Sequence, residues 1–282
     1  VLGLSIAKLP RLTDFQSNVE ETIPIRPIAI EDVLGRPQQV LDRTSMMGLV
    51  KGKRILVTGA GGTIGSELAR QIAEFRPLSL CLLESSEYAL YSIDLEIKER
   101  HPELRVKSVI ADIRDNIRIG QIFRMFKPEL VFHAAALKHV PIVESDPSEG
   151  ILTNIQGTKN IADVCCESHV SAMVLISTDK AVNPTSIMGA TKRVAEIYCQ
   201  ALDIKETNTT RFVTVRFGNV LGSTGSVVPL FQRQLSNGGP LTITHPEMKR
   251  YFMTVREAVE LVLEATVLGK KHDSYPGRVY VL

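Results

Sequence analysis

The stretch KRILVTGAGGTIGSELARQIAEF, residues 53–75, joins an apolar run to an amphipathic run through a turn rich in glycine. Residues 53–59 predict a short buried strand, and residues 63–75 have apolar side chains at the three-to-four spacing of a helix. Gly59, Gly62 and Gly65 lie in and just after the turn, where the backbone needs angles that other residues resist. A strand, a glycine turn and a helix in this order predict the first unit of a parallel sheet.

The alternation of short apolar runs and amphipathic runs continues to residue 220. We expect strands at 78–84, 105–112, 130–136, 171–178 and 211–220, and helices at 88–100, 116–126, 150–168 and 188–202. Short apolar strands that alternate with helices form a parallel sheet covered on both faces. The predicted fold class is therefore α/β, a doubly wound (Rossmann) parallel sheet. Past Asn219 the alternation breaks, and we expect only short elements in a small C-terminal substrate-binding portion.

This pattern divides the chain into three predicted segments. Residues 1–50 contain several prolines and little periodicity, which predicts a linker or docking arm. Residues 51–210 are expected to form the dinucleotide-binding domain, and residues 211–282 the substrate-binding portion, interleaved with the sheet. The chain begins with valine and ends in the apolar stretch GRVYVL, so we expect both ends to be cut from a longer protein.

Composition sets broad limits on the class of protein. The 282 residues are 44% hydrophobic and 23% charged with a net charge of +2, which fits a domain with a sizeable core and predicts no nucleic-acid surface. No apolar run reaches the roughly 18 residues of a membrane span. The four cysteines form no pairing pattern, and the six histidines show no metal-ligand spacing. We therefore expect reduced thiols, a cytoplasmic domain and no metal.

The glycine turn also predicts a dinucleotide site, because N–H groups at the start of a helix bind phosphates that glycine lets approach. Glu84 ends the second predicted strand, where a carboxylate can accept both adenosine ribose hydroxyls and repel a 2′-phosphate. A structural turn with a solvated Glu84 is the alternative. Asp112 either holds the adenine amine or caps the helix expected near 115–126. The predicted cofactor is NAD, with contacts from Gly59, Gly62, Thr63, Ile64, Gly65, Glu84, Asp112, Ile113, Ala134 and Ala135.

The stretch STDKAVNPTSIMGATK, residues 177–192, places polar groups at the carboxyl end of a central predicted strand. Doubly wound sheets bind ligands at that end. Thr178, Asp179 and Lys180 follow the strand directly, while Met188 and Lys192 are four residues apart and share one face of the next helix. Without its neighbours the stretch also fits a plain structural role, with Asp179 as a cap, Lys180 solvated and Met188 in the core.

Six motifs that occur in a fixed order are a more specific indication of function than this single stretch. They are TGAGGTIG, HAAALKHVPIVE, TNIQGT, STDKAVNPTSIMGATK, RFGNVLGSTGSVVPLF and KRYFMT. Together they resemble the extended short-chain dehydrogenase/reductase superfamily, and within it the membrane-type UDP-N-acetylglucosamine 4,6-dehydratases of bacterial capsular polysaccharide synthesis. The resemblance covers residues 51–282, and residues 1–50 are similar to that branch's linker from its membrane portion to its catalytic domain.

The resemblance implies a lyase reaction in which NAD is recycled internally. The sugar C4 gives a hydride to NAD⁺, the C5 proton and the C6 hydroxyl are lost as water, and the hydride returns to C6. By the same resemblance Asp179 is the acid for the C6 oxygen and Lys180 the base at C5. Thr178 is expected to hydrogen-bond the C4 oxygen, and Lys192 to hold the nicotinamide ribose.

Met188 stands where most of the superfamily has a tyrosine that moves a proton. A thioether has no titratable proton, so Met188 cannot take the C4 hydroxyl proton. Members of the membrane-type branch also have methionine there, and the resemblance implies that Met188 packs against the sugar and the nicotinamide. Two groups remain as acceptors of that proton: Asp179, which would then act both here and as the acid for the C6 oxygen, or a water that Asp179 orients.

The remaining contacts implied by the resemblance are to the UDP-sugar. Lys138 lies on a loop over the cofactor, and Asn154 supports the site through backbone and water contacts. Asn219 and Arg250 are expected at the pyrophosphate, where a guanidinium offers forked donors. A solvated Lys138, a plain polar helix residue at 154 and a surface ion pair of Arg250 are the alternatives.

The leading function is an NAD-dependent, C5-retaining UDP-N-acetylglucosamine 4,6-dehydratase that makes a UDP-4-keto-6-deoxy-N-acetylhexosamine. A C5-inverting dehydratase/epimerase and a non-catalytic NAD-binding regulatory protein are the alternatives. Met188 favours retention, because the proton donor on the opposite face is missing. The expected partner is a UDP-sugar and no nucleic acid. The resemblance implies a parent protein anchored at the inner membrane, and it leaves a homo-oligomer open.

Overall fold

The computed structural model describes residues 7–8, 26–27, 42–223, 227–243, 245–248, 250–270 and 275–282. Residues 1–38 form a unit of their own, in which the described residues are the antiparallel strands β1 (Ala7–Lys8) and β2 (Arg26–Pro27). The rest of the predicted arm up to residue 41 lies outside the described residues.

The larger unit, residues 39–282, contains the remaining elements. Its strands are β3 (Arg54–Thr58), β4 (Ser79–Glu84), β5 (Val106–Ile110), β6 (Leu130–His133), β7 (Ala172–Thr178), β8 (Arg211–Phe217), β9 (Asn219–Val220), β10 (Phe252–Met253) and β11 (Val279–Val281). Its helices are α1 (Arg43–Val50), α2 (Thr63–Glu74), α3 (Glu87–Arg100), α4 (Asn116–Phe126), α5 (Val140–Ser145), α6 (Pro147–Gly150), η3 (Ile151–Gly157), α7 (Thr158–Glu167), η4 (Asp179–Ala181), α8 (Ile187–Ile204), α9 (Val227–Ser236) and α10 (Val255–Gly269).

Seven of the described strands form one parallel sheet in the order β11-β8-β7-β6-β3-β4-β5. The order reverses at β3: β4 and β5 continue toward one edge, and β6, β7 and β8 toward the other. Doubly wound sheets bind ligands beyond the carboxyl ends of the strands, at such a reversal. The predicted fold class is confirmed, and the reversal lies directly at the predicted glycine turn.

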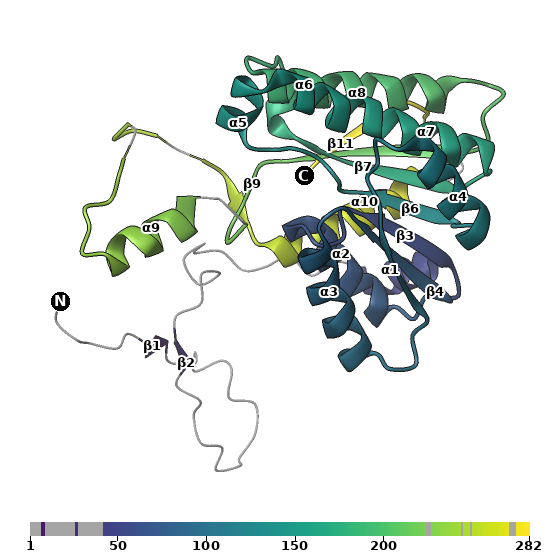
Figure 1. Cartoon of the computed structure of the whole chain (residues 1–282), viewed down its shortest axis with the longest axis horizontal. Coiled ribbons are helices and arrows are strands. Elements are labelled where there is room, and N and C mark those ends of the chain that lie inside the picture. The colour runs from purple at the N-terminus through teal and green to yellow at the C-terminus, as the bar shows by residue number, and fades with distance from the viewer. Residues whose placement is uncertain are drawn as a thin grey trace, which may run out of the picture. The chain divides into compact units, whose positions relative to one another are not determined.

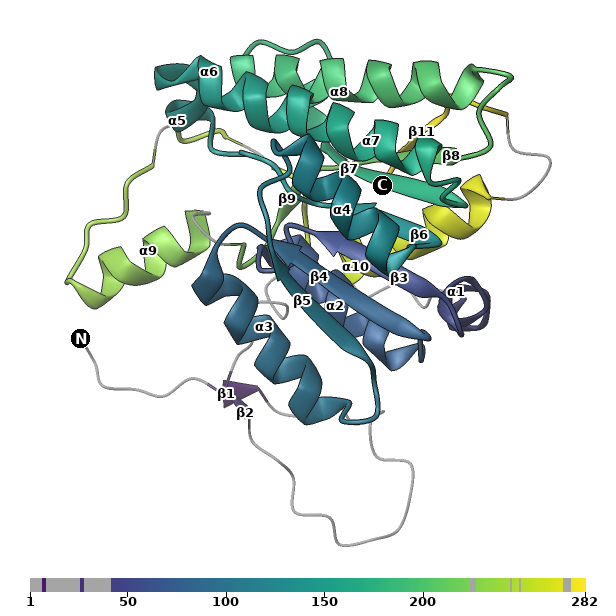
Figure 2. The same cartoon turned by 45° about the vertical axis from the view of Figure 1, so that its right-hand side comes forward.

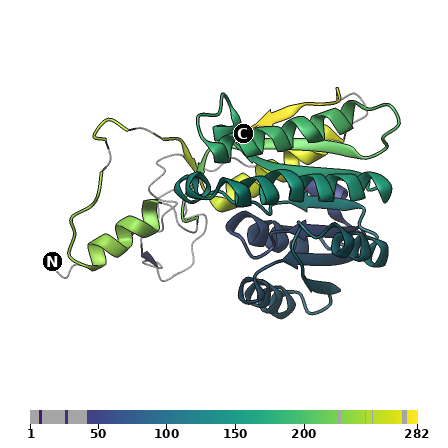
Figure 3. The same cartoon turned by 45° about the horizontal axis from the view of Figure 1, so that its top comes forward.

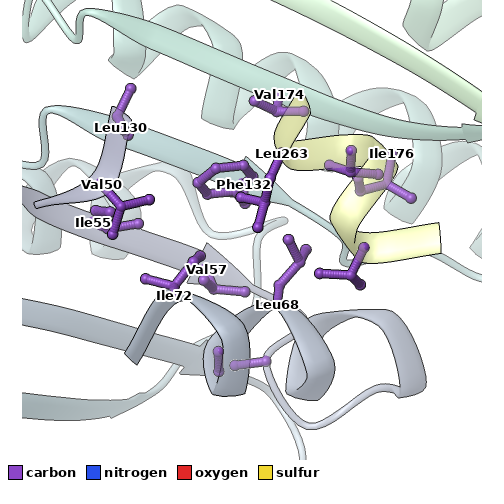
Figure 4. Close-up of a cluster of buried hydrophobic side chains, with 14 of the residues drawn as sticks. Val50, Ile55, Val57, Leu68, Ile72, Leu130, Phe132, Val174, Ile176 and Leu263 are labelled. Atoms are coloured by element: carbon purple, nitrogen blue, oxygen red, sulfur yellow. The ribbon is translucent and has the colours of Figure 1, made fainter. Parts of the chain in front are cut away.

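Helices cover both faces of this sheet (Figure 1, Figure 2). Strand residues alternate between the two faces, and the inner strands β3, β4, β6 and β7 are buried on both of them. Ile55, Val57 and Phe132 belong to a buried cluster with residues of α1, α2, α3 and α10, part of which Figure 4 shows. Leu56 and Val131 belong to a second cluster with residues of α4, α7 and α8. The two clusters hold the sheet between its helical layers and fix the carboxyl ends of its strands.

Helix α1 lies inside the stretch that the sequence assigned to the arm. Met46, Leu49 and Val50 are buried in the cluster under the sheet. Arg43 makes an ion pair with Glu74 of α2, with 2.6 Å between Nη2 and Oε2. The arm therefore ends at residue 38 instead of the predicted residue 50, because the apolar face of this short amphipathic helix packs on the other elements of the larger unit.

The prediction of only short elements past Asn219 is wrong for α10. This helix has 15 residues, and its buried face includes Ala258, Val262 and Leu263. Its start carries a signal that the sequence does contain: Thr254 is the N-cap and its side chain accepts a hydrogen bond from the N–H of Glu257 at 3.0 Å. Helix α9, by contrast, stands clear of the seven-stranded sheet in all three views (Figure 1, Figure 2, Figure 3).

Candidate active site

The glycine turn between β3 and α2 is packed so closely that side chains are excluded at Gly59, Gly61 and Gly65. Gly59 has a φ of +63°, and a Cβ there would lie 2.6 Å from the backbone N of Ala135. A Cβ on Gly65 would lie 1.9 Å from the carbonyl oxygen of Gly59. Gly62 is the N-cap of α2 and provides no side chain to cap the helix start. The turn is therefore a backbone cradle at the positive end of a helix, which suits a phosphate.

Glu84 has a second role that the sequence did not indicate. Its Oε2 accepts a hydrogen bond from the N–H of Gly61 at 3.0 Å, and its Oε1 accepts one from the N–H of Ser85 at 2.8 Å. The carboxylate at the end of β4 thus closes the glycine turn, while the residue stays partly exposed. The position fits the predicted contact with a ribose, and that contact stays a prediction.

Asp112 is not the cap of the fourth helix. The N-cap of α4 is Asp115, whose side chain accepts a hydrogen bond from the N–H of Arg118 at 2.9 Å. Asp112 instead pairs with Arg114, with 2.6 Å between Oδ2 and Nη2. Hydrogen bonds from Arg114 lower the pKa of Asp112 against the smaller effect of burial. The cap alternative is thus wrong, and the contacts of Asp112 with adenine and of the buried Ile113 with the cofactor stay predictions.

The predicted catalytic triplet lies at the carboxyl end of β7, where the strand runs into η4. The hydroxyl of Thr178 donates to Asp179 Oδ1 at 2.9 Å, and the ammonium of Lys180 donates to the same oxygen at 3.0 Å. Asp179 and Lys180 are exposed, with side-chain exposures of 51% and 42%. The three groups therefore form one hydrogen-bonded cluster that is open to a ligand.

Helix α8 brings Met188 and Lys192 to the same end of the sheet, and both are buried. The ammonium of Lys192 donates to the carbonyl oxygen of Ile176 on β7 at 2.6 Å. Burial lowers the pKa of Lys192 to about 8, while nearby Glu196 and Cys199 act in the opposite direction. The structure thus brings the triplet and the methionine–lysine pair to adjoining elements, as predicted.

Asn154 connects the loop after β6 with α8. Its Oδ1 accepts from the N–H of Leu137 at 2.8 Å, and its Nδ2 donates to the carbonyl of Leu137 at 2.9 Å and to Thr191 Oγ1 at 3.0 Å. Asn154 is fully buried and lies in η3, a π-helical stretch within the helix predicted for 150–168. The exposed Lys138 follows Leu137. These contacts describe a support for the loop, and direct contacts of Asn154 and Lys138 with substrate stay predictions.

Asn219 and Arg250 lie at two neighbouring chain segments, because β9 and β10 pair in parallel with Asn219 opposite Phe252. The Asn219 amide donates to the carbonyl of Tyr251 at 3.5 Å. A Cβ built on Gly218 would lie 3.6 Å from that carbonyl and 3.8 Å from Asp179 Oδ2. The backbone next to Asn219 and Arg250 therefore lies near the predicted acid, and contacts of these two side chains with the pyrophosphate stay predictions.

His133 is buried directly beneath the glycine turn. Its Nδ1 lies 2.7 Å from Thr58 Oγ1 and its Nε2 lies 3.0 Å from Thr158 Oγ1, so two hydroxyls satisfy a neutral ring. Burial, with a smaller contribution from the charge of Lys192, lowers the pKa of His133 to about 3. No role was predicted for His133, although a histidine at the end of an apolar strand was a signal.

This buried histidine predicts that acid destabilises the fold. In the unfolded chain His133 binds a proton below a pH of about 6.5, whereas in the folded protein it does so only below a pH of about 3. Stability therefore falls as the pH falls from about 6.5 to about 3. Between pH 7 and pH 5 we expect the wild type to lose about 2 kcal/mol more unfolding free energy than His133→Gln. Urea unfolding at both pH values measures the difference. The exposed His169, changed to Gln, is the control, and equal losses in wild type and His133→Gln would contradict the prediction.

Two further properties of the described residues concern membranes and metals. None of the helices there is both long and apolar enough to cross a membrane. Groups of three or more histidine, cysteine or carboxylate side chains that could hold a metal ion are absent from the same residues.

Comparison with known proteins identifies a family. The family described as polysaccharide biosynthesis protein matches residues 55–280. The capsular polysaccharide biosynthesis protein CapD of Staphylococcus aureus is 47% identical over 281 residues, which are 99% of this chain and 46% of CapD. A UDP-N-acetylglucosamine 4,6-dehydratase (inverting) of Campylobacter jejuni is 35% identical over 218 residues, 76% of this chain and 64% of that enzyme.

Two further proteins are similar. A membrane protein of Methanocaldococcus jannaschii is 42% identical over 233 residues, 82% of this chain and 67% of that protein. The X-ray structure of Pen from Bacillus thuringiensis superposes with a TM-score of 0.76 at 33% identity, covering 83% of this chain and 71% of Pen. The chain spans about half the length of relatives such as CapD.

Proposed function

Because the chain belongs to the polysaccharide biosynthesis protein family, in the capsular branch of the extended short-chain dehydrogenases/reductases, we propose that it is an NAD-dependent UDP-N-acetylglucosamine 4,6-dehydratase. The reaction removes water and leaves a UDP-4-keto-6-deoxy-N-acetylhexosamine. The observation that carries the proposal is the hydrogen-bonded cluster of Thr178, Asp179 and Lys180 at the carboxyl end of β7. It offers an acid and a base side by side, which an elimination requires.

The residues around the glycine turn fit NAD. Gly59 and Gly65 leave no room for a side chain, which lets a pyrophosphate approach the backbone and the start of α2. Glu84 would meet the adenosine ribose, and Lys192 the nicotinamide ribose. When bound, NAD supplies a hydride acceptor that is regenerated within each turnover. Ala134 and Ala135, which follow β6, would line the same site with small side chains.

At rest, Asp179 and Lys180 form an ion pair rather than an acid and a base. Burial raises the pKa of Asp179, but the hydrogen bonds from Lys180 and Thr178 and the charge of Lys180 together outweigh it, and the net pKa is lowered. The elimination needs the opposite protonation state, a neutral amine and a protonated carboxyl. A shift of one proton along the 3.0 Å hydrogen bond from Lys180 to Asp179 converts one form into the other. A bound sugar that excludes water favours the neutral form, because desolvation penalises two charges.

The proton transfers of the elimination then balance within the pair of Asp179 and Lys180, which we call the couple. The Lys180 amine takes the proton from C5 of the 4-keto sugar, and the electron pair of that C–H bond forms the C5–C6 double bond. The C6–O bond breaks while Asp179 gives its proton to the departing hydroxyl, which leaves as water. This step returns the couple to its ion pair. Lys180 later gives the proton back to C5 on the same face, which retains the configuration.

The proton count of the couple separates the two candidates for the C4 hydroxyl proton. If Asp179 takes that proton, the couple must start as a carboxylate and an amine, one proton fewer than the ion pair. If an oriented water takes it, the couple starts with the same number of protons as the ion pair. We expect log kcat to rise with pH at a slope of about one in the first case, and to stay flat between about pH 6 and 8 in the second. Initial rates over this range measure the difference.

The test of the proposed function is incubation with UDP-N-acetylglucosamine, with no NAD added. We expect mass spectrometry to find a product that has lost one water, and NMR to find retained configuration at C5. A substrate with deuterium at C4 should give product with deuterium at C6. Intact substrate, from protein that holds NAD, would support the regulatory alternative instead.

The inverting reaction is the second candidate, because the Campylobacter jejuni relative carries that word in its name. Inversion needs a proton donor on the face of C5 opposite Lys180. Met188 has no proton to give. The C5 configuration of the product decides between them, since an inverted product would require a donor other than Lys180.

We also propose that the longer protein is anchored at a membrane, with this unit in the cytoplasm. The name of the Methanocaldococcus jannaschii relative and the doubled length of CapD support this. The full-length protein should sediment with membranes after cell lysis and stay there in high salt. A full-length protein that remains in the supernatant would contradict the proposal.

A further inference from the structure

Glu196 on α8 is a fully buried carboxylate that neither the motifs nor the proposed reaction use. Its Oε1 accepts hydrogen bonds from the Ser177 hydroxyl at 2.5 Å and from Arg216 Nε at 2.8 Å. Its Oε2 accepts from Arg193 Nη1 at 3.0 Å and also from Arg216 Nη2. These four donors satisfy both oxygens, and they lower the pKa of Glu196 although its burial raises it.

The donors come from the elements that carry the candidate site. Ser177 is the residue before Thr178 at the end of β7, and it pairs in register with Arg216 on β8. Two residues beyond Arg216, Gly218 lies beside the carboxylate of Asp179. Glu196 therefore ties two neighbouring strand ends to α8 within one turn of Lys192. A shift of this carboxylate would move the start of the acid–base triplet relative to α8.

Glu196 also opposes a concentration of positive charge in the interior. Lys192, Arg193 and Arg216 all lie close to it. Its negative charge raises the pKa of Lys192 against the effect of burial. The other groups near Lys192 are His133 on β6, the Ile176 carbonyl on β7 and Cys199 on α8, and η4, which carries Asp179 and Lys180, packs against α8.

We propose that Glu196 is a positioning residue: its carboxylate holds the ends of β7 and β8 against α8 and places a negative charge one helical turn from Lys192. The proposal rests on the proposed function for the roles of Asp179, Lys180 and Lys192. Two of its consequences, the effect of Glu196 on the charge of Lys192 and on the placement of the triplet, can be measured without turnover. If the carboxylate only stabilised the fold, its removal would alter neither of them.

The test uses two variants and a matched control. Glu196→Gln keeps the volume but removes the charge, and Ser177→Ala removes one contact but keeps the charge. Glu260→Gln is the control, because Glu260 is also a largely buried helical carboxylate paired with arginines, Arg256 at 3.2 Å and Arg43 at 3.5 Å, on α10. Circular dichroism establishes that each variant is folded, and NMR of protein labelled with ¹³Cε-lysine follows each amine without any ligand. Lys192→Arg and Lys180→Arg assign the two resonances.

We expect Lys192 in Glu196→Gln to lose its proton at a lower pH than in the wild type, where the midpoint should be about 8. In Ser177→Ala the Lys192 midpoint should stay, while the Lys180 resonance shifts and kcat falls about tenfold with little change in KM. Glu260→Gln should match the wild type in every measurement. An unchanged Lys192 midpoint in folded Glu196→Gln, or an unchanged Lys180 resonance in Ser177→Ala, would overturn the proposal. If the wild type does not turn over UDP-N-acetylglucosamine, the proposed function fails while the two NMR results still decide this one.

Discussion

Replacing Asp179 with asparagine should lower kcat by at least about a thousandfold and leave NAD binding within a factor of about two. An amide has nearly the same shape as the carboxyl and still accepts the hydrogen bonds of Thr178 and Lys180, so the cluster at the end of β7 should persist. It cannot give a proton to the C6 oxygen. The hydroxyl would then have to leave unprotonated, and the elimination should stop.

Mass spectrometry of the reaction mixture and calorimetric titration with NAD measure the two effects separately. Asp94→Asn is a matched control, because Asp94 also pairs with a lysine, Lys98 at 2.7 Å, but lies on α3. We expect the control to keep full activity. Turnover of Asp179→Asn within tenfold of the wild type would mean that another group, or a water, protonates the leaving oxygen.

Replacing Gly65 with alanine should be the most damaging change to the cofactor site. The new Cβ would lie 1.9 Å from the carbonyl oxygen of Gly59, which is backbone and cannot rotate away. The start of α2 must then move off the turn, which should cost roughly 2–5 kcal/mol of unfolding free energy. Because the phosphates of NAD need the turn and the helix start together, we also expect more than about a hundredfold loss of NAD affinity.

The neighbouring glycine provides the comparison for this prediction. A Cβ on Gly62 would lie 3.3 Å from the same carbonyl oxygen, at a φ of −72°, so Gly62→Ala should cost less than about 1 kcal/mol. Denaturant unfolding and titration with NAD measure both variants. If Gly65→Ala and Gly62→Ala proved equally stable, the close approach between the turn and α2 would not be what holds this end of the sheet.

The sequence predicted the sheet well, because the inner strands β3, β4, β6 and β7 are apolar on both faces and their runs are short. Ile55 and Leu56 point to opposite faces and both are buried, so no surface pattern obscures β3. The arm boundary failed for a related reason: in α1 three buried side chains face the main unit, and eight residues are too few to give a clear period. Helix α10 was missed although Thr254 and Glu257 provide a capping signal.

The site was predictable where residues act in a local motif, and not where they act across the fold. Thr178, Asp179 and Lys180 are consecutive, and Met188 and Lys192 are one helical turn apart, so spacing alone groups them. The partners of Glu196 lie 19 and 20 residues away on two strands. The contact of Glu84 with Gly61 spans 23 residues. Such contacts depend on the strand order, which a single sequence does not reveal.

The reversal of strand order at β3 has a consequence for protein engineering. The residues proposed for the adenosine half lie on β4 or just after β3 and β5, and those proposed for the reacting half lie on β7 or on elements that follow β6, β7 and β8. Along the described strands of the sheet, the chain passes from the first set to the second between β5 and β6. Chimaeras that join two relatives at this crossing should exchange cofactor preference and sugar chemistry as independent modules.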